Sequence, residues 1–235
     1  MLKDFFFPRR CPVCDRPVKP FGALICTACE NKIKYVAPPY CLKCGKSVAP
    51  DAGAYCFDCT LRKHGFDQAV SLFDYKSVAM SLYRFKYKGR REYADYYGER
   101  LATVLGKQIL SWKPQAIIPV PIHASKRRMR GYNQAELVAR SLSGYLSVPV
   151  ETEWIKRCKK TVPLKDLSPL ERQNNLKKAF IMCCNDVKLD TIVILDDIYT
   201  TGSTVDEMAR LLRANGVSKI YVVTLAIGRG LSPLQ

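Results

Sequence analysis

The sequence predicts an α/β fold in which helices flank a parallel sheet, with a small cysteine-rich domain in front of it. Two observations support this prediction. Eight of the eleven cysteines lie in four C-x-x-C pairs within the first quarter of the chain. From about Phe66, apolar segments typical of buried strands alternate with amphipathic helical segments. The 235 residues exceed the commonest single-domain length, and we place the two domains at residues 1–65 and 66–235.

The paired cysteines repeat with a period of 30 residues, so that the first two pairs lie over the last two. Four thiolates from two such pairs close a tetrahedral Zn²⁺ site, which is structural because no position stays open. The repeat favours one zinc ion within each unit, although pairing of the first with the third pair and the second with the fourth is also sterically possible. The expected ligands of two zinc ions are Cys11, Cys14, Cys26, Cys29, Cys41, Cys44, Cys56 and Cys59.

The other three cysteines lack this spacing. We interpret Cys158, Cys183 and Cys184 as ordinary thiols and expect the adjacent pair, which follows an apolar run, to be partly buried. So many cysteines in a chain without a signal-peptide pattern favour metal binding in a reducing, cytoplasmic compartment. No apolar run approaches the ~20 residues of a membrane span, so we expect no membrane insertion.

The formal net charge is +17, and the excess of basic residues lies before residue 180. The last 55 residues contain five basic and six acidic side chains. Polyanions such as nucleic acid or phosphorylated sugars are the expected partners, although a solvated lysine-rich surface explains the same composition. Two Zn(Cys)₄ centres, each with a charge of −2, would lower the net charge to about +13.

Strand and helix patterns alternate through the second domain. Helical spacing of apolar residues is found at 77–87, 93–110, 135–146 and 205–212, the last before the stop signal Asn215-Gly216. Strands are expected at 68–75, 114–122, 191–195 and 219–228, with a polar loop after the second of them. Ligands of such sheets bind at the carboxyl ends of the strands.

Two acids and a small polar turn follow the strand "TIVIL" directly. Asp196 and Asp197 end the strand, and the segment 200–204, "TTGST", leads into a helix. Free N–H groups and the positive field at a helix N-terminus hold a phosphate, and a glycine allows its close approach. The paired acids suit ribose hydroxyls and a hydrated Mg²⁺. A ribose 5-phosphate site is therefore expected here; neither a P-loop nor a dinucleotide motif is present.

The segment "VILDDIYTTGST" resembles the phosphoribosyl pyrophosphate (PRPP) loop of type I phosphoribosyltransferases. "PVPIHASKRRMRGYNQAELVA" and "LSPLERQNNLKKAF" are similar to segments of the ComF family of late competence proteins, which also carry N-terminal double zinc ribbons. The resemblance covers nearly the whole chain and identifies it as a ComFC-like member of that family. One departure is Leu164, where family members often have Gln, so the loop between Trp154 and Lys178 is expected to cover its ligand differently.

The resemblance implies roles for individual residues. It implies catalysis, if retained, by Asp196, Asp197, Lys126 and Arg128, with magnesium bound alongside PRPP and the basic residues near 126–130 facing pyrophosphate. A lone His123 is more often a hydrogen-bonded loop residue than a general base. The residues expected to bind PRPP or phosphate are Asp196, Asp197, Thr200, Thr201, Gly202, Ser203, Thr204, Lys86, Arg130, Arg172 and Asn175.

Two functions follow from the resemblance. The first is handling of imported single-stranded DNA in the cytoplasm, with a retained PRPP site, together with a ComF-operon helicase and the DNA-uptake channel. Basic and aromatic residues interleave in segment 83–97, a composition typical of single-strand binding. The second is an active Mg²⁺-dependent phosphoribosyltransferase; a zinc-ribbon adaptor with a vestigial loop is a third reading. The expected DNA-binding residues are Arg84, Lys86, Tyr87, Lys88, Arg90, Arg91 and Arg127.

Overall fold

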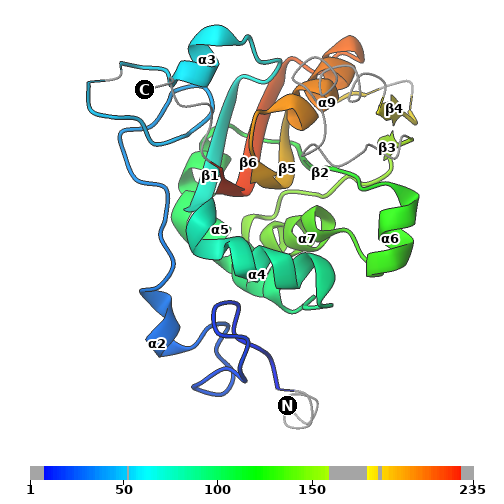
Figure 1. The fold of residues 1–235 in the computed structure, drawn as a ribbon. Coiled ribbons are helices and arrows are strands. Elements are labelled where there is room, and N and C mark those ends of the chain that lie inside the picture. Colours follow the sequence, from blue (N-terminus) through cyan, green and yellow to red (C-terminus); the bar gives the residue numbers. More distant parts are fainter. Residues whose placement is uncertain (1–7, 52, 159–178, 185–186, 229–235) are drawn as a thin grey trace.

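The computed structural model describes residues 8–51, 53–158, 179–184 and 187–228 (Figure 1). Its centre is a four-stranded parallel sheet with the order β1-β6-β5-β2. The two long central strands contain runs of buried apolar residues, as expected of strands that lie inside the sheet rather than at its edge. The strands are β1 (Gln68–Asp74), β2 (Ala116–Pro119), β5 (Thr191–Tyr199) and β6 (Lys219–Ile227).

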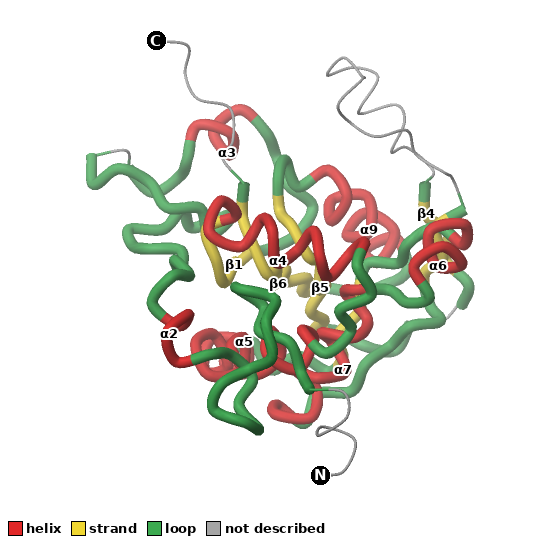
Figure 2. Tube along the Cα trace, turned by 60° about the horizontal axis from the view of Figure 1, so that its bottom comes forward, coloured by secondary structure: helices red, strands yellow, loops and turns green. Residues whose placement is uncertain are grey.

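Helices cover both faces of the sheet, as predicted. In β5, Val193 and Leu195 pack with helices α4 (Tyr75–Tyr87), α5 (Tyr93–Ser111) and α7 (Gln134–Leu146). The alternate residues Ile192 and Ile194 pack with α9 (Ser203–Ala214) on the other face, because successive strand side chains point to opposite sides. Helix α4 follows β1 directly and crosses in front of the strands in Figure 2.

Two elements depart from the sequence prediction. The expected polar loop after β2 contains helix α6 (Ala124–Arg130), which has no apolar stripe but is capped at both ends. His123 caps its N-terminus, and Gly131, at φ 78°, ends it in the left-handed conformation. The antiparallel pair β3 (Ile155–Arg157) and β4 (Phe180–Met182) brackets the segment that contains Leu164, which lies outside the described residues.

The two cysteine-rich ribbons lie at opposite ends of the molecule in Figure 1. The first carries helix α2 (Thr27–Glu30) and packs with α4 and α5; the second carries α3 (Phe57–Leu61) and packs on the α9 face. Between them, Tyr35 pairs antiparallel with Phe73 of β1, flanked by backbone hydrogen bonds. The connection between the ribbons therefore extends the parallel sheet by a short antiparallel edge.

The three cysteines outside the C-x-x-C pairs are only partly as expected. Cys184 is half-buried, but its neighbour Cys183 is exposed, as is Cys158. The prediction of partial burial was therefore wrong for Cys183, which follows a short strand whose burial alternates with each residue.

Candidate functional site

Two acids lie near the carboxyl end of β5, one toward each face of the sheet. Asp197 continues the row of Val193 and Leu195 toward α4, whereas Asp196 lies toward α9 and pairs in register with the buried Thr224 of β6. Burial and the adjacent Asp197 charge raise the pKa of Asp196 to about 7. A cation bound near this carboxyl group would lower its pKa, because a positive charge favours the ionised form.

A group of basic side chains surrounds the acids. Lys86 of α4 donates to Asp197 Oδ1 over 2.9 Å, and both side chains are less than one-fifth exposed. Burial alone would lower the pKa of Lys86, but the charge of Asp197 outweighs it and raises the pKa. Burial lowers the pKa of Lys126, and the charges of Arg157 and Arg130 lower it further. These cations repel one another, so an anion between them would be stabilised.

The turn between β5 and α9 has the features expected of a phosphate loop. Gly202 adopts φ 78° and precedes the first helical residue, and no side chain caps the helix N-terminus. Among the described residues, no side chain accepts a hydrogen bond from the N–H groups of the first turn. The hydroxyls of Thr201 and Ser203 lie 2.9 Å apart across the turn. With Asp196, Thr200 and Thr204 these residues line a pocket of about 20 Å³, room for one water-sized group.

His64 and Phe66, which follow the second ribbon in the chain, pack against this loop and the start of α9. His64 Nδ1 is 2.8 Å from Asp206 Oδ2 of α9, and the ring stacks on Phe66. A Cβ on Gly202 would lie 2.5 Å from Tyr199 Oη and 3.0 Å from His64 Cε1, so only glycine fits there. His64 Nε2 is buried without a hydrogen-bond partner among the described residues. His64 could not be predicted from the sequence, because a single histidine after a ribbon carries no spacing signal.

A second cavity, of about 450 Å³, adjoins the loop at the carboxyl ends of β1 and β6. It shares Ile198 and Thr200 with the smaller pocket, and most of its lining surface is apolar. This volume lies in the range of small-molecule sites. The remaining lining residues are Asp74, Tyr75, Lys76, Ile227 and Gly228.

The basic residues predicted on segment 126–130 divide between two sides of α6. Lys126 and Arg130, one helical turn apart, are half-buried toward the acids, and Arg130 Nη1 donates to Gln134. Arg127 is exposed and pairs with Glu136 over 3.1 Å. Arg128 is exposed as well, in contrast to its half-buried neighbours at 126 and 130. His123 caps α6 and contacts Ser125, as expected of a loop histidine.

Arg157 joins the site without having been predicted from the sequence. It lies in the three-residue strand β3, its guanidinium is 5.2 Å from the ring centre of Phe180, and its charge acts on Asp196. So short a strand has no periodic signal that could have found it. The predicted Arg172 and Asn175 lie outside the described residues.

The stretch predicted to bind single strands is partly occupied by internal contacts. Arg84 and Arg90 bind Asp15 of the first ribbon, and Arg91 stacks on Tyr132. Tyr87 is 53% exposed and lies under the guanidinium of Arg130. Lys88 is also exposed.

The eight paired cysteines form two groups of four, one within each ribbon. In each group all ligand atoms lie within 4.8 Å of one another. Cys44 Sγ and Cys56 Sγ are 3.6 Å apart, close to the ~3.8 Å that two thiolates have on one tetrahedral zinc ion. The donor sets therefore fit two zinc ions, and the pairing within each repeat unit is correct whereas the crossed pairing is wrong.

The sheet, the loop after β5 and the ribbons define a phosphoribosyltransferase-type domain joined to a double zinc ribbon. Family models agree: residues 2–60 match the double zinc ribbon domain, and residues 129–232 match the phosphoribosyl transferase domain. No helix in the described part of the chain is long and apolar enough to cross a membrane.

Competence protein F of Haemophilus influenzae is 33% identical to the chain over 72% of this chain and 76% of that protein. DNA utilization protein YhgH of Escherichia coli K12 is 30% identical, over 70% and 74%. Competence protein ComFC of Bacillus subtilis is 27% identical, over 62% and 58%. The chain therefore belongs to the competence protein F family.

Solved structures are similar at a lower level. The purine phosphoribosyltransferase from Pyrococcus horikoshii is 15% identical, with a TM-score of 0.34, over 59% of this chain and 91% of that one. The assignment of the fold rests instead on the parallel sheet and the matching family model.

Proposed function

We propose that the chain binds PRPP, or a closely related ribose 5-phosphate, together with Mg²⁺ at the β5–α9 loop, and that it handles single-stranded DNA. The observation that carries the first part is the loop itself. A twelve-residue helix begins at Ser203 without a side-chain cap, a short turn after the acid pair and beside a group of half-buried cations.

The sugar phosphate is expected at the loop. N–H groups of the first turn of α9 and the hydroxyls of Thr201 and Ser203 face the same turn. Such a turn favours an anion through free donors and the positive end of the helix. Because the enclosed pocket is only about 20 Å³, a phosphate would rest at its mouth or widen it slightly.

The ribose hydroxyls and the metal are expected at the acid pair. Carboxylate oxygens are the ligands that Mg²⁺ accepts, usually together with several waters and substrate oxygens. Asp196 and Asp197 supply these oxygens, and the raised pKa of Asp196 fits a carboxyl group that a cation would ionise. The ion would neutralise charge on a pyrophosphate group, while Lys86 keeps Asp197 in place.

The remaining anionic part of the ligand is expected among the cations. Lys126 and Arg157 are both partly buried with lowered pKa values, and Arg130 lies beside them. A pyrophosphate between these side chains would offset their mutual repulsion. We therefore expect Lys126, Arg130 and Arg157 to bind the phosphosugar ligand rather than the DNA backbone.

Single-stranded DNA handling is supported by an exposed aromatic pair and by the relatives. Tyr83 and Tyr87 are 46% and 53% exposed, with ring centres 5.2 Å apart on the outer face of α4. Exposed tyrosines next to cations are a common platform for unstacked bases. The relatives are named for competence and DNA utilization. We expect bases at Tyr83 and Tyr87, with Lys88 near the phosphates.

Transfer of the ribosyl group to a base is a second candidate. The observation in its favour is the 450 Å³ cavity beside the loop, which is large enough for a flat heterocycle. An enzyme would release pyrophosphate from PRPP when an acceptor base occupies this cavity.

One experiment tests the site before any choice of acceptor. Calorimetric titration of the zinc-loaded chain with PRPP, with and without Mg²⁺, should give saturable binding that Mg²⁺ strengthens. Absence of binding under both conditions contradicts the proposal. Adding a panel of bases and measuring pyrophosphate tests the transferase candidate.

The DNA part is tested separately. Affinity for a single-stranded oligonucleotide should fall steeply with added salt, and Tyr83→Ala with Tyr87→Ala should weaken it by about tenfold or more. The control is Tyr145→Ala, another exposed tyrosine, on α7. Binding that is insensitive to salt and to the paired substitution contradicts DNA stacking at this surface.

A further inference from the structure

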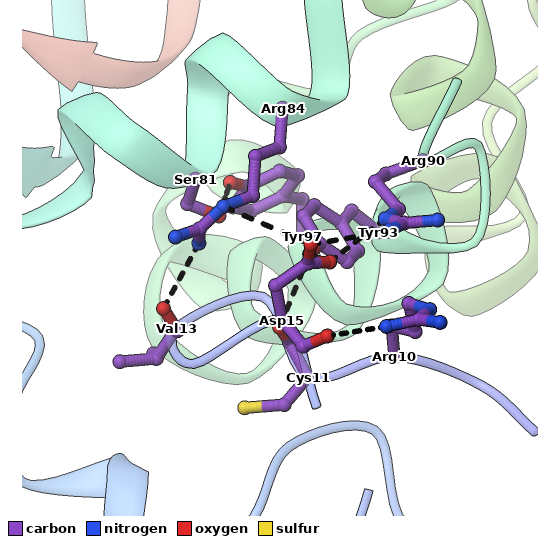
Figure 3. Close-up of polar contacts among 9 residues, drawn as sticks. All are labelled: Arg10, Cys11, Val13, Asp15, Ser81, Arg84, Arg90, Tyr93 and Tyr97. Carbon is purple, nitrogen blue, oxygen red and sulfur yellow. Dashed lines mark hydrogen bonds and ion pairs between the residues drawn. The ribbon is translucent and has the colours of Figure 1, made fainter. Parts of the chain in front are cut away.

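The first zinc-binding turn contacts the segment of the chain that carries Lys86. Asp15, directly after the second cysteine of this turn, accepts two hydrogen bonds from Arg90 at 2.7 and 3.1 Å and one from Tyr93 at 2.7 Å (Figure 3). Arg84 donates to the carbonyl of Val13 and lies 4.0 Å from the Asp15 carboxylate. The turn thus holds both ends of the segment 84–93.

Lys86 lies between these two arginines and faces the opposite way. Its ammonium group donates to Asp197 at the end of β5, and its side chain is 17% exposed. The intervening Phe85 is fully buried, so the last turn of α4 cannot rotate without moving core side chains. The same helical turn therefore contacts the zinc ribbon on one side and the acid pair on the other.

We infer that Asp15 is a positioning residue for the ligand site. By holding Arg84 and Arg90, the metal-bound turn keeps the end of α4 where Lys86 meets Asp197. Asp15 itself touches no ligand. The inference rests on the proposed function, because the coupled event is binding of PRPP with Mg²⁺ at the acid pair. It makes the first ribbon part of the binding machinery rather than a separate appendage.

The alternative is that Asp15 only fastens the ribbon to the surface. Helix α4 has further support of its own, since Tyr132 donates to the carbonyl of Phe85 and Ser81 contacts Tyr97 over 2.5 Å. If these contacts suffice, removing the Asp15 carboxylate loosens the ribbon and leaves Lys86 unchanged. The two explanations differ in whether Asp15 and Lys86 act together.

The first variant is Asp15→Gly. Asp15 has φ 58°, and glycine adopts this conformation without strain, as Gly45 does at the equivalent position of the second ribbon. The zinc-loaded full chain should keep two zinc ions and bind PRPP with Mg²⁺ about tenfold more weakly. Asp15→Asn, which keeps an acceptor oxygen, should lie in between. Asp95→Asn removes the carboxylate charge from a different ion pair, Arg9 with Asp95 at 2.6 Å, and should bind like the wild type.

A double-mutant cycle then separates positioning from fastening. In a Lys86→Gln background, Asp15→Gly should cause little further loss of affinity, because its effect passes through Lys86. An equal tenfold loss in both backgrounds, or no loss in either, overturns the inference.

Hydrogen exchange tests the same coupling without ligand. In zinc-loaded Asp15→Gly, amides of 84–88 and of Asp197 should exchange faster than in the wild type, whereas Asp95→Asn should change neither. Exchange that changes only within the ribbon overturns the inference. If the wild type binds no PRPP but these amides respond, the proposed function fails and the coupling stands.

Discussion

The two zinc ribbons share the same C-x-x-C turn, but the residue that follows its second cysteine differs between them. Asp15 and Gly45 each follow the second cysteine of a C-x-x-C pair, adopt φ 58° and 71°, and donate a backbone hydrogen bond to the first cysteine of that pair. At Gly45 a Cβ would lie 2.5 Å from the carbonyl oxygen of Ala69, so the second turn needs a bare backbone. At Asp15 a carboxylate binds two arginines instead. The repeat determines the metal site, and one residue on it determines what the ribbon contacts.

The two ribbons also differ in their contacts with the sheet domain. Cys41 and Cys44 are buried in the same core as α9, and the chain that follows brings His64 against the β5–α9 loop. The first ribbon packs apolar residues against α4 and α5 as well, but its Cys14 is exposed and Asp15 adds charged contacts with Arg84 and Arg90. We therefore expect the second ribbon to contribute more to stability and the first to be easier to detach.

The largest expected effect comes from removing one zinc ligand in each ribbon. Cys44→Ser should lose one zinc ion and lower the free energy of unfolding by about 4 kcal/mol or more, because it disrupts a buried core as well as a metal site. Cys14→Ser should lose one zinc ion with a smaller effect on the sheet domain. Zinc content and urea unfolding measure both. Equal losses of stability would break the comparison.

The next effect isolates the close approach at the second turn. Gly45→Ala should destabilise the protein by about 3 kcal/mol, since a left-handed φ and a collision with Ala69 act together. Gly53→Ala is the matched control: it has φ 75° but no atom within 4 Å of the added Cβ, so only the strain of about 1 kcal/mol remains. Urea unfolding of both variants measures the difference. Similar values would mean that the backbone at Ala69 moves aside.

A third effect concerns the loop that the second ribbon supports. Gly202→Ala places a methyl group against Tyr199 and His64 and should abolish PRPP binding while the chain still binds two zinc ions. Tyr199→Phe in the same variant removes the nearest oxygen and should recover part of the binding. Gly144→Ala, on α7 with open space around it, is the control and should leave binding unchanged. Calorimetry with PRPP and Mg²⁺ measures all three; normal binding by Gly202→Ala would mean that the loop is not the phosphate site.

The regular parts of this fold could be predicted from the sequence because their signals are local and repeated. Apolar runs at 191–195 and 219–228 indicated buried strands, and the spacing of Val205, Met208 and Leu212 indicated α9; all three elements are present, although β5 continues past the two acids to Tyr199 instead of ending at them. The cysteine repeat likewise favoured the correct grouping of ligands. Each of these depends on residues close in the chain.

The contacts that complete the site could not be predicted in this way. Arg157 reaches Asp196 from a strand of three residues, and His64 reaches α9 across more than a hundred residues of sequence. The arginines of segment 84–91 have the composition of a DNA-binding stretch, yet two of them bind Asp15. Composition counts charges, whereas tertiary contacts decide which of them remain available to a ligand.

The last expected effect is a pH dependence of stability at Asp196, near the carboxyl end of β5. Burial and the neighbouring Asp197 raise the pKa of Asp196 to about 7, well above its value in an unfolded chain. Folding therefore favours the protonated form, and the associated stability is present below about pH 4 and is lost as the pH rises toward 7. In buffer without Mg²⁺, the free energy of unfolding of the zinc-loaded wild type should therefore decline across this window. The comparison is with Asp196→Asn, whose side chain cannot ionise.

Urea unfolding of both proteins between pH 5 and 7.5, where thiolate ligands still hold zinc, measures the decline. Mg²⁺ with PRPP should reduce it, because a bound cation stabilises the ionised carboxylate. Parallel pH profiles for the two proteins would mean that Asp196 is already ionised in the folded chain. The charges of Arg157 and Lys86 would then have to balance the charge of Asp196. The acid on the α9 face of β5 would in that case be as well neutralised as Asp197, which Lys86 binds on the other face.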